Sequence, residues 1–515
     1  MTNALSFQPS ASMLYVSPIV EALRGRPRLV FWTATLTQAL LWVLVPSLFY
    51  ASPPGEVPLV LAVGHEWQLG SAYGPPLAYW LAELAFRLAG GSVVGVYLLS
   101  QACVVTTFWA VFALGRAIVG LTHAALAVLL MVGISAFAVP SPDFGPAVLA
   151  MPLTALALLS YWRAVGEGHR GSWIALGIVL GLLMLTTYFG AILLALIVVF
   201  TLATERGRAT LRDFYPYVAM LIACVVALPH LVWLLDRRFA VLAAAADATI
   251  AASVIGWFKL LAALIAAHAG LAVLVIVAGI LVADRKAAVP EFVRQPVDPF
   301  PKLFVYTFAL APAVVAALIA AIGGQADLPG GMGALVVLSG LAVIVLAGDV
   351  IRLYHQNIAG WTWAALLVGP PALAVVSIIV LPWTLAMELK VNEPAADMGR
   401  FFTESFNRRT GKPLAIVVGD GRLASLVALA SPQRPSVLID AAYERAPWVS
   451  EAHVRAKGAI VVWPIADAAG APPAHIRARF PDLVPEVPHA FERAFQGRLP
   501  LMRVGWAMIR PQTGE

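Results

Sequence analysis

The sequence predicts a multi-pass α-helical membrane protein that carries a small α/β domain at its C-terminus. Of the 515 residues, 61% are hydrophobic and only 12% are charged, and the mean hydropathy is +0.85. A water-soluble domain would need far more polar side chains to cover its surface. The other two observations are a series of long apolar segments up to residue 386 and a change to charged, proline-containing sequence after Asn392.

A membrane helix needs about 20 apolar residues to cross a hydrocarbon core of roughly 30 Å. The segment 1–27 is too polar for a cleavable signal peptide and is expected to precede the first span. We expect about eleven spans, at 28–50, 93–115, 121–140, 144–163, 172–188, 190–204, 214–235, 254–283, 302–322, 332–349 and 359–386.

Basic residues gather at alternate ends of these spans, which predicts the orientation of the chain. Basic loops favour the cytoplasmic side, so the N-terminus is expected there, with the basic groups at 24–28, 116–123, 163–170, 206–212, 285–302 and 352. The loops at 51–92, 141–143, 236–253 and 323–331 then lie outside. Arg237 and Arg238 are exceptions on that side, and they are either a snorkelling pair or phosphate ligands.

The net charge of +6 and the isoelectric point of about 9.4 could suggest nucleic acid binding. Because the basic residues are scattered at helix ends and form no patch, nucleic acid is excluded as a partner. Cys103 and Cys224 both fall in apolar segments, so we expect buried packing roles for them. The sequence therefore predicts neither a disulfide framework nor a cysteine metal site.

An odd number of spans places residues 391–515 on the outer side, after a transmembrane region at 28–390. Short β-branched runs at 414–418, 436–439, 459–463 and 504–509 predict strands, and the stretches 397–410 and 421–431 suit helices. The sequence Gly419-Asp420-Gly421 follows the first of these strands. We interpret it as a strand-to-helix turn in preference to a phosphate-binding turn, because two glycines are weak evidence for the latter.

The outer region at 51–92 is the first place to look for chemistry. Residues 75–88 predict an amphipathic interfacial helix with Glu83 and Arg87 four residues apart. Tyr79 and Trp80 on this helix are expected to be an aromatic anchor at headgroup level. Glu56 directly follows the first span and is either a solvated or a functional carboxylate.

A second acid lies in the tight turn at 140–146. The turn pins Asp143 at membrane level, where carboxylates are costly and tend to be functional. Its other interpretation is a cap on the following helix.

Several motifs occur together: the acidic loop after the first span, Tyr-x-Pro-Pro-Leu-x-x-Trp at 73–80, Gly-Arg-Ala-Ile-Val-Gly at 115–120, the Pro-Asp turn at 142–143 and the C-terminal domain. In order and spacing they resemble the GT-C membrane glycosyltransferases. The most similar branch is the protein mannosyltransferase and aminoarabinose transferase group, with its bacterial relatives that modify lipopolysaccharide. The resemblance covers mainly residues 28–235.

The resemblance implies an inverting transfer of a sugar from a polyprenyl-phosphate carrier to an extracytoplasmic acceptor, which is lipid A or lipopolysaccharide, another envelope glycan or lipid, or a protein. By position, Glu56 and Asp143 correspond to the catalytic acids, with Glu56 deprotonating or orienting the acceptor. The remaining substrate-binding candidates are His65, Glu66, Tyr73, Arg87, His230, Arg237 and Arg238. Some members use a divalent cation, and nothing in this sequence shows a ligand set for one.

The sequence departs from the family pattern at two places. Relatives open the first outer loop with an aspartate, so the base here is Glu56, or Glu66, or is missing. Thr187 stands where relatives carry a lysine. A non-catalytic family member and a flippase or transporter for lipid-linked sugars therefore stay as alternatives. The composition is rich in Ala, Arg and Pro and poor in Lys, which indicates a bacterial protein. We therefore expect the chain in the inner membrane, in contact with membrane lipids, with its C-terminal domain in the periplasm.

Overall fold

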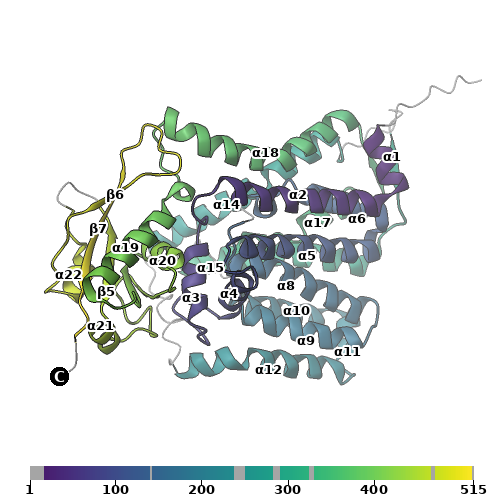
Figure 1. Cartoon of the computed structure of the whole chain (residues 1–515). Coiled ribbons are helices and arrows are strands. Elements are labelled where there is room, and N and C mark those ends of the chain that lie inside the picture. The colour runs from purple at the N-terminus through teal and green to yellow at the C-terminus, as the bar shows by residue number, and fades with distance from the viewer. Residues whose placement is uncertain are drawn as a thin grey trace, which may run out of the picture.

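The computed structural model describes residues 17–139, 142–236, 250–281, 290–323, 330–465 and 470–512. Long helices run side by side, and an α/β region lies at one end of them (Figure 1). Within the described residues, seven helices are long and apolar enough to cross a membrane: α2 (Pro27–Phe49), α5 (Val94–Val119), α8 (Pro146–Tyr161) with its π-helical extension η1 (Trp162–Gly166), α12 (Tyr215–Asp236), α14 (Ile250–Ala278), α15 (Pro299–Gly323) and α18 (Gln356–Thr384). The expected multi-pass helical fold is confirmed.

The other four expected spans are helical. They coincide with α6 (Leu121–Met131), α9 (Gly171–Met184), α10 (Phe189–Ala203) and the pair α16 (Gly331–Leu335) and α17 (Ser339–Leu346). Three of them are shorter than predicted, whereas α10 has the predicted length of 15 residues. The span expected at 121–140 breaks after Met131 and resumes in the short α7 (Ser135–Ala138). At this break Gly133 lies against the backbone of Gly270 in α14, where a Cβ atom would clash, so helix contact takes the place of a continuous span.

The bundle has two different ends. The short helices α3 (Val57–His65) and α4 (Leu77–Leu88) lie at the end that carries the α/β region, whereas α1 (Pro18–Gly25) and α11 (Glu205–Thr210) lie at the other end (Figure 1). A two-stranded antiparallel sheet of β1 (Glu291–Val293) and β2 (Val350–Arg352) lies with α1, since Arg24 donates a hydrogen bond to the Glu291 carbonyl at 2.9 Å. We call the end with α3, α4 and the α/β region the tail end, and the end with α1, α11 and the β1–β2 sheet the arginine-rich end. The distribution agrees with the alternation predicted from the basic residues.

The centre of the bundle is aromatic and is built around α8, whose residues are mostly buried. The Tyr161 ring contacts the rings of Phe200, Phe304 and Phe308 at centroid distances of 6.1 to 6.2 Å. Peripheral helices such as α12 and α18 expose most of their apolar side chains, as helices facing lipid do. Cys103 is buried as predicted, but the buried role predicted for Cys224 is wrong, because this residue lies on the exposed face of α12.

The described residues after α18 form the tail, which contains a five-stranded sheet in the order β4-β3-β5-β7-β6. Strands β3 (Ile416–Gly419), β4 (Ser436–Ile439) and β5 (Ala459–Pro464) are parallel, and β7 (Met502–Ile509) pairs antiparallel with β5. The helices are α19 (Ala395–Thr410), α20 (Gly421–Ala430), α21 (Glu451–Lys457) and α22 (Ala474–Arg479). The four predicted strands and two predicted helices are all present, and the short edge strand β6 (His489–Phe491) was not predicted.

The turn at Gly419-Asp420-Gly421 is a strand-to-helix turn, as we interpreted it. The Asp420 side chain caps α20 by accepting a hydrogen bond from the Leu423 amide at 3.0 Å. The Gly421 amide donates to the Asp440 carboxylate at 3.2 Å. Side chains of the tail therefore already use the amides that would have held a phosphate.

One arginine of the tail holds the outer loop. Arg422, on α20, donates to the carbonyl oxygens of Gly55 (2.6 Å) and Pro53 (3.1 Å), and also to that of Lys390 (3.0 Å). Its Nε donates to the Glu393 carboxylate at 2.9 Å, and the two side chains are only 16% and 13% exposed. The tail is thus fixed to the turn that precedes α3 through a mostly buried cation.

We expect the substitution Arg422→Ala to lower the free energy of unfolding by about 3 kcal/mol, because it leaves the Glu393 carboxylate and three carbonyl oxygens without their donor. Thermal unfolding of the purified protein measures this loss. The matched control is Arg408→Ala, which removes an exposed arginine of α19. Equal unfolding temperatures for the two variants would contradict a docking role for Arg422.

Candidate functional site

The two predicted acids, Glu56 and Asp143, meet at the tail end of the bundle. The backbone amide of Glu56 donates a hydrogen bond to Asp143 Oδ1 at 2.9 Å. Glu56 is exposed at the start of α3, and Asp143 is half-buried in the loop before α8. The fold therefore brings together two carboxylates that are 87 residues apart in sequence, on one turn of the outer surface.

This contact requires a glycine at position 55. Gly55 has a φ angle of +46°, and a Cβ atom at this residue would overlap the Asp143 carboxylate. Only glycine tolerates both the left-handed backbone and so close an approach. The sequence Pro-Gly-Glu, which departs from the family pattern, is thus the sequence that lets Asp143 pack against the turn.

The surroundings of Asp143 favour its protonated form more than water does. Burial raises the pKa of the Asp143 carboxyl above its ordinary value, and the negative charge of Glu56 acts in the same direction. The hydrogen bond from the Glu56 amide and the charges of Arg422 and Lys390 oppose this effect without overcoming it. A carboxylate with a raised pKa is a better proton acceptor than a fully solvated one.

Tyr73 lies near this pair, on the loop between α3 and α4. Burial raises the pKa of the Tyr73 hydroxyl to about 12. The negative charges of Asp440 and Glu56 also raise this pKa, whereas the positive charge of Arg445 lowers it. Asp440 and Arg445 belong to the tail and form an ion pair at 2.5 Å. Tyr73 therefore stays protonated at neutral pH, between charged groups of the outer loop and of the tail.

The aromatic pair at the start of α4 braces the outer loop. Tyr79 is only 5% exposed, and its hydroxyl donates to the Tyr73 carbonyl at 2.9 Å. The Trp80 indole donates to the Gln68 carbonyl at 3.0 Å. The prediction of a headgroup anchor is wrong for Tyr79, because the loop folds back over this side chain.

Two residues predicted to bind phosphate are engaged by a buried carboxylate. Glu83, on α4, is 2% exposed and contacts Arg87 at 2.7 Å, which is the pair predicted from their spacing, and His65 at 3.4 Å. From the tail, Arg434 reaches the other Glu83 oxygen at 3.0 Å and stacks on the Phe86 ring at 4.4 Å. His65 and Arg87 thus take part in a second contact between the outer loop and the tail, which we call the Glu83 cluster.

Glu66, the alternative base, lies at the opposite end of α3 from Glu56. The nine residues of this helix separate the two ends by roughly 13 Å, so Glu66 is not on the Asp143 turn. Burial raises the pKa of its carboxyl, and one carboxylate oxygen is buried without a hydrogen-bond partner.

His230, on α12, lies beneath the same loop. Its Nδ1 is 3.1 Å from the Leu69 carbonyl, whereas its Nε2 is buried and has no hydrogen-bond partner among the described residues. The Tyr188 ring lies 5.9 Å away, and within the same part of the chain its hydroxyl is also buried and unpartnered. A buried polar atom without a partner costs free energy, so such a pair points to a ligand that supplies one. Thr187 is buried beside them.

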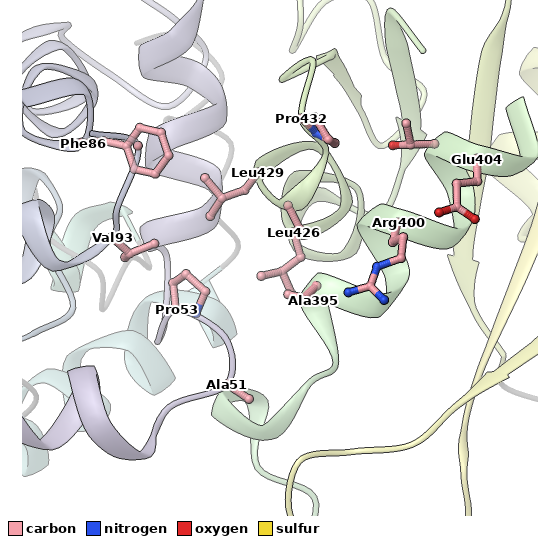
Figure 2. Close-up of a pocket in the computed structure, with 14 residues that line it drawn as sticks. Ala51, Pro53, Phe86, Val93, Ala395, Arg400, Glu404, Leu426, Leu429 and Pro432 are labelled. Atoms are coloured by element: carbon pink, nitrogen blue, oxygen red, sulfur yellow. The ribbon is translucent and has the colours of Figure 1, made fainter. Parts of the chain in front are cut away.

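A cleft of about 450 Å³ separates the outer loop from the tail (Figure 2). Pro53, Phe86 and Val93 form its wall on the membrane region. Leu426 and Leu429 of α20 face them, and Arg400 and Glu404 of α19 line the tail side. The cleft thus combines apolar walls with two charged side chains, and it reaches the chain two residues before Gly55.

Comparisons with known proteins agree with this architecture. Residues 73–233 match the model of the family described as dolichyl-phosphate-mannose-protein mannosyltransferase. The crystal structure of ArnT from Cupriavidus metallidurans bound to undecaprenyl phosphate aligns with a TM-score of 0.53 at 14% identity, over 94% of this chain and 99% of that chain. The chain has the GT-C fold.

Two further solved structures align less well. The apo state of the same ArnT gives a TM-score of 0.45 at 13% identity, over 94% of this chain and 99% of that chain. AglB, an oligosaccharyltransferase from Archaeoglobus fulgidus, in complex with an inhibitory peptide and a dolichol-phosphate, gives 0.39 at 13% identity, over 86% of this chain and 70% of that chain. No curated protein sequence matches the chain.

The predicted phosphate ligands Arg237 and Arg238 lie outside the described residues, as do residues 239–249. In the part of the chain that the structure describes, no three His, Cys, Asp or Glu side chains gather in a way that could hold a metal ion. We therefore derive no step that uses a divalent cation.

Sequence reasoning missed the contribution of the tail to this candidate site. Arg422, Arg434, Asp440 and Arg445 all approach the outer loop from the tail. No local pattern marks them, because each acts on a residue more than 350 positions away in sequence. The one available signal is that these four charged residues all fall between strands β3 and β5.

We expect Glu83→Gln to destabilise the protein by about 3 kcal/mol at neutral pH, because it leaves the mostly buried Arg434 without a counter-charge. Burial alone would raise the pKa of Glu83, but the hydrogen bonds from His65 and Arg87 and the charge of Arg434 hold it below the ordinary 4.5. The Glu83 contribution is therefore complete above pH 4.5 and is lost as the pH falls through the lowered pKa.

Unfolding temperatures of wild type and Glu83→Gln, measured against pH, test this prediction. The gap between them should close as the medium becomes more acidic than pH 4.5. Glu404→Gln, a change of an exposed carboxylate on α19, should show no such pH-dependent gap. A gap for Glu83→Gln that stays constant down to acid unfolding would contradict the ion cluster.

Proposed function

We propose that this chain is an inverting glycosyltransferase that moves a sugar from a polyprenyl-phosphate carrier to an acceptor at the tail end. The observation that carries the proposal is the half-buried Asp143 carboxylate, held by the Glu56 amide on the outer turn of a GT-C fold. The similar ArnT structure binds undecaprenyl phosphate, which supports a carrier of the same chemical class. The tail end is the extracytoplasmic side in this proposal, and the membrane is a bacterial inner membrane.

Asp143 is the general base in this mechanism. The acceptor hydroxyl gives its proton to the Asp143 carboxylate while its oxygen attacks the anomeric carbon of the donor sugar. The bond from that carbon to the carrier phosphate breaks on the opposite face, so the phosphate leaves with the bonding electrons and the configuration inverts. The raised pKa of Asp143 suits a base, and the exposed Glu56 orients the acceptor beside it.

The carrier phosphate has candidate partners under the loop. His230 Nε2 and the Tyr188 hydroxyl are buried polar atoms without a partner in the described protein. The Tyr188 hydroxyl can donate to a phosphate oxygen, and His230, whose Nδ1 donates to the Leu69 carbonyl, can donate from Nε2 in its imidazolium form. They lie on α12 and on the turn before α10, where a carrier whose lipid chain runs between helices would present its head. This pair would take over part of the role of the lysine that relatives carry at the position of Thr187.

The cleft between the outer loop and the tail is the proposed route of the acceptor. Its apolar walls suit a lipid-linked or otherwise amphipathic acceptor, and Arg400 and Glu404 offer hydrogen bonds to sugar hydroxyls or phosphates. Pro53, on its wall, belongs to the same turn as Gly55, so an acceptor in the cleft approaches the Asp143 turn from the tail side.

Asp143→Asn is expected to reduce transfer by about 10²- to 10⁴-fold, the usual contribution of a general base. Glu56→Gln should also impair transfer, with the protein still folded, because its backbone amide is unchanged. Mass spectrometry of the envelope lipids and glycans of a deletion strain, complemented with each variant, measures the product. Asp397→Asn, which changes an exposed carboxylate of α19, is the matched control and should restore the product fully.

The same experiment separates the alternative functions. Full restoration by Asp143→Asn would overturn the proposed base and support a non-catalytic family member. A flippase for lipid-linked sugars would tolerate loss of both carboxylates, and its deletion would let the sugar-loaded carrier accumulate on the side where it is made. A product that depends on Asp143 but not on Glu56 would keep the transferase and remove only the orienting role of Glu56.

A further inference from the structure

A polar cavity of about 600 Å³ lies at the arginine-rich end, far from the Asp143 turn. Three arginines from different elements line it: Arg24 of α1, Arg116 of α5 and Arg294 just after β1. His123, in the first turn of α6, lines it as well. None of these residues takes part in the proposed transfer.

The cavity carries an excess of positive charge. Arg24 donates to a backbone carbonyl, and Arg116 is exposed with no carboxylate within ion-pair distance among the described residues. Two carboxylates lie nearby, and each is already paired: Glu291 with Arg352 at 2.7 Å, and Asp349 with Arg294 at 3.2 Å. Two arginine charges in the cavity are therefore not neutralised, which favours an anion there.

Two buried polar atoms on the cavity wall have no hydrogen-bond partner within the part of the chain that the structure describes. They are Nε2 of His123, a side chain that is only 3% exposed, and Nε of Arg294. The guanidinium N–H of Arg294 is a donor that suits a phosphate oxygen and is costly to leave unsatisfied. His123 donates from its other ring nitrogen to the Phe292 carbonyl, so the Nε2 of the neutral ring is an acceptor that suits a hydroxyl group on the ligand.

An apolar groove of about 540 Å³ adjoins this cavity. The same helices line the groove and the cavity. On α1, Leu23 lines the groove and the next residue, Arg24, lines the cavity. On α6, Leu126 of the groove lies one turn beyond His123 of the cavity. The groove continues along α2, α14 and α18, three helices that are long and apolar enough to cross a membrane.

We propose that this end of the protein binds a membrane lipid with an anionic phosphate head group. The phosphate occupies the cavity between Arg24, Arg116 and Arg294, and an acyl chain lies in the groove next to Leu23. A soluble phosphate compound would leave the groove uncovered, whereas an uncharged lipid would leave the arginines unneutralised. The two adjoining features together fit one molecule that is anionic at its head and apolar along its chain.

Native mass spectrometry of the delipidated full-length protein in detergent tests this proposal. The probes are phosphatidylglycerol, phosphatidylcholine with identical acyl chains, and inorganic phosphate. We expect phosphatidylglycerol to bind at least about tenfold more tightly than phosphatidylcholine, as for hydrogen bonds to charged groups. The double variant Arg24→Gln, Arg116→Gln should lose this preference. The double control Arg26→Gln, Arg28→Gln, which also removes two exposed charges but outside the cavity, should retain it.

A second variant tests the groove. Thr33 is an exposed groove residue of α2, and Thr33→Trp should fill the groove and reduce phosphatidylglycerol binding about tenfold. The lipid proposal would be overturned if this variant bound phosphatidylglycerol as well as wild type and inorganic phosphate displaced the lipid. The cavity would then be a site for free phosphate. Equal binding of the two lipids by the wild type would overturn the anionic site itself. Both readouts are independent of sugar transfer.

Discussion

The packing of Asp143 against the turn at Gly55 is the contact on which the outer site depends. It joins the end of the first long helix to the loop before α8, and it leaves no room for a side chain at position 55. The same turn presents the Glu56 amide to Asp143 and two carbonyl oxygens to Arg422. The backbone conformation at Gly55 thus determines the distance between Glu56 and Asp143, the partial burial of Asp143 and the position at which the tail attaches.

The tail is part of the site because its arginines reach into the outer loop. Arg422 holds the turn before α3, and Arg434 pairs with the buried Glu83 on α4. Each arginine is mostly buried, so loss of either contact would leave charges in a poorly solvated place. Arg422 contacts the turn before α3, whereas Arg434 contacts α4, so the tail is held to the membrane region at two separate places.

The two ends of the bundle handle charge differently. At the tail end, carboxylates and arginines pair with one another, and among the described residues His230 Nε2 and the Tyr188 hydroxyl are buried close together without a partner. At the arginine-rich end, arginines outnumber their carboxylate partners, and an apolar groove starts beside them. A molecule that works on lipid-linked substrates at one end would therefore hold a structural lipid at the other, and the two sites are separated by the apolar length of the bundle.

Composition and periodicity determined the membrane class, the positions of the apolar helices, the strands of the tail and the pair Glu83–Arg87, because these features depend on neighbours in sequence. The sequence also marked Glu56 and Asp143 as unusual, since carboxylates beside apolar helices are costly. Only the tertiary structure decided that the two acids meet, that Glu66 lies at the other end of α3, and that His65 and Arg87 are occupied by Glu83. These outcomes depend on contacts between segments far apart in sequence, such as Arg434 with Glu83, and no local pattern encodes which distant partner a charge will find.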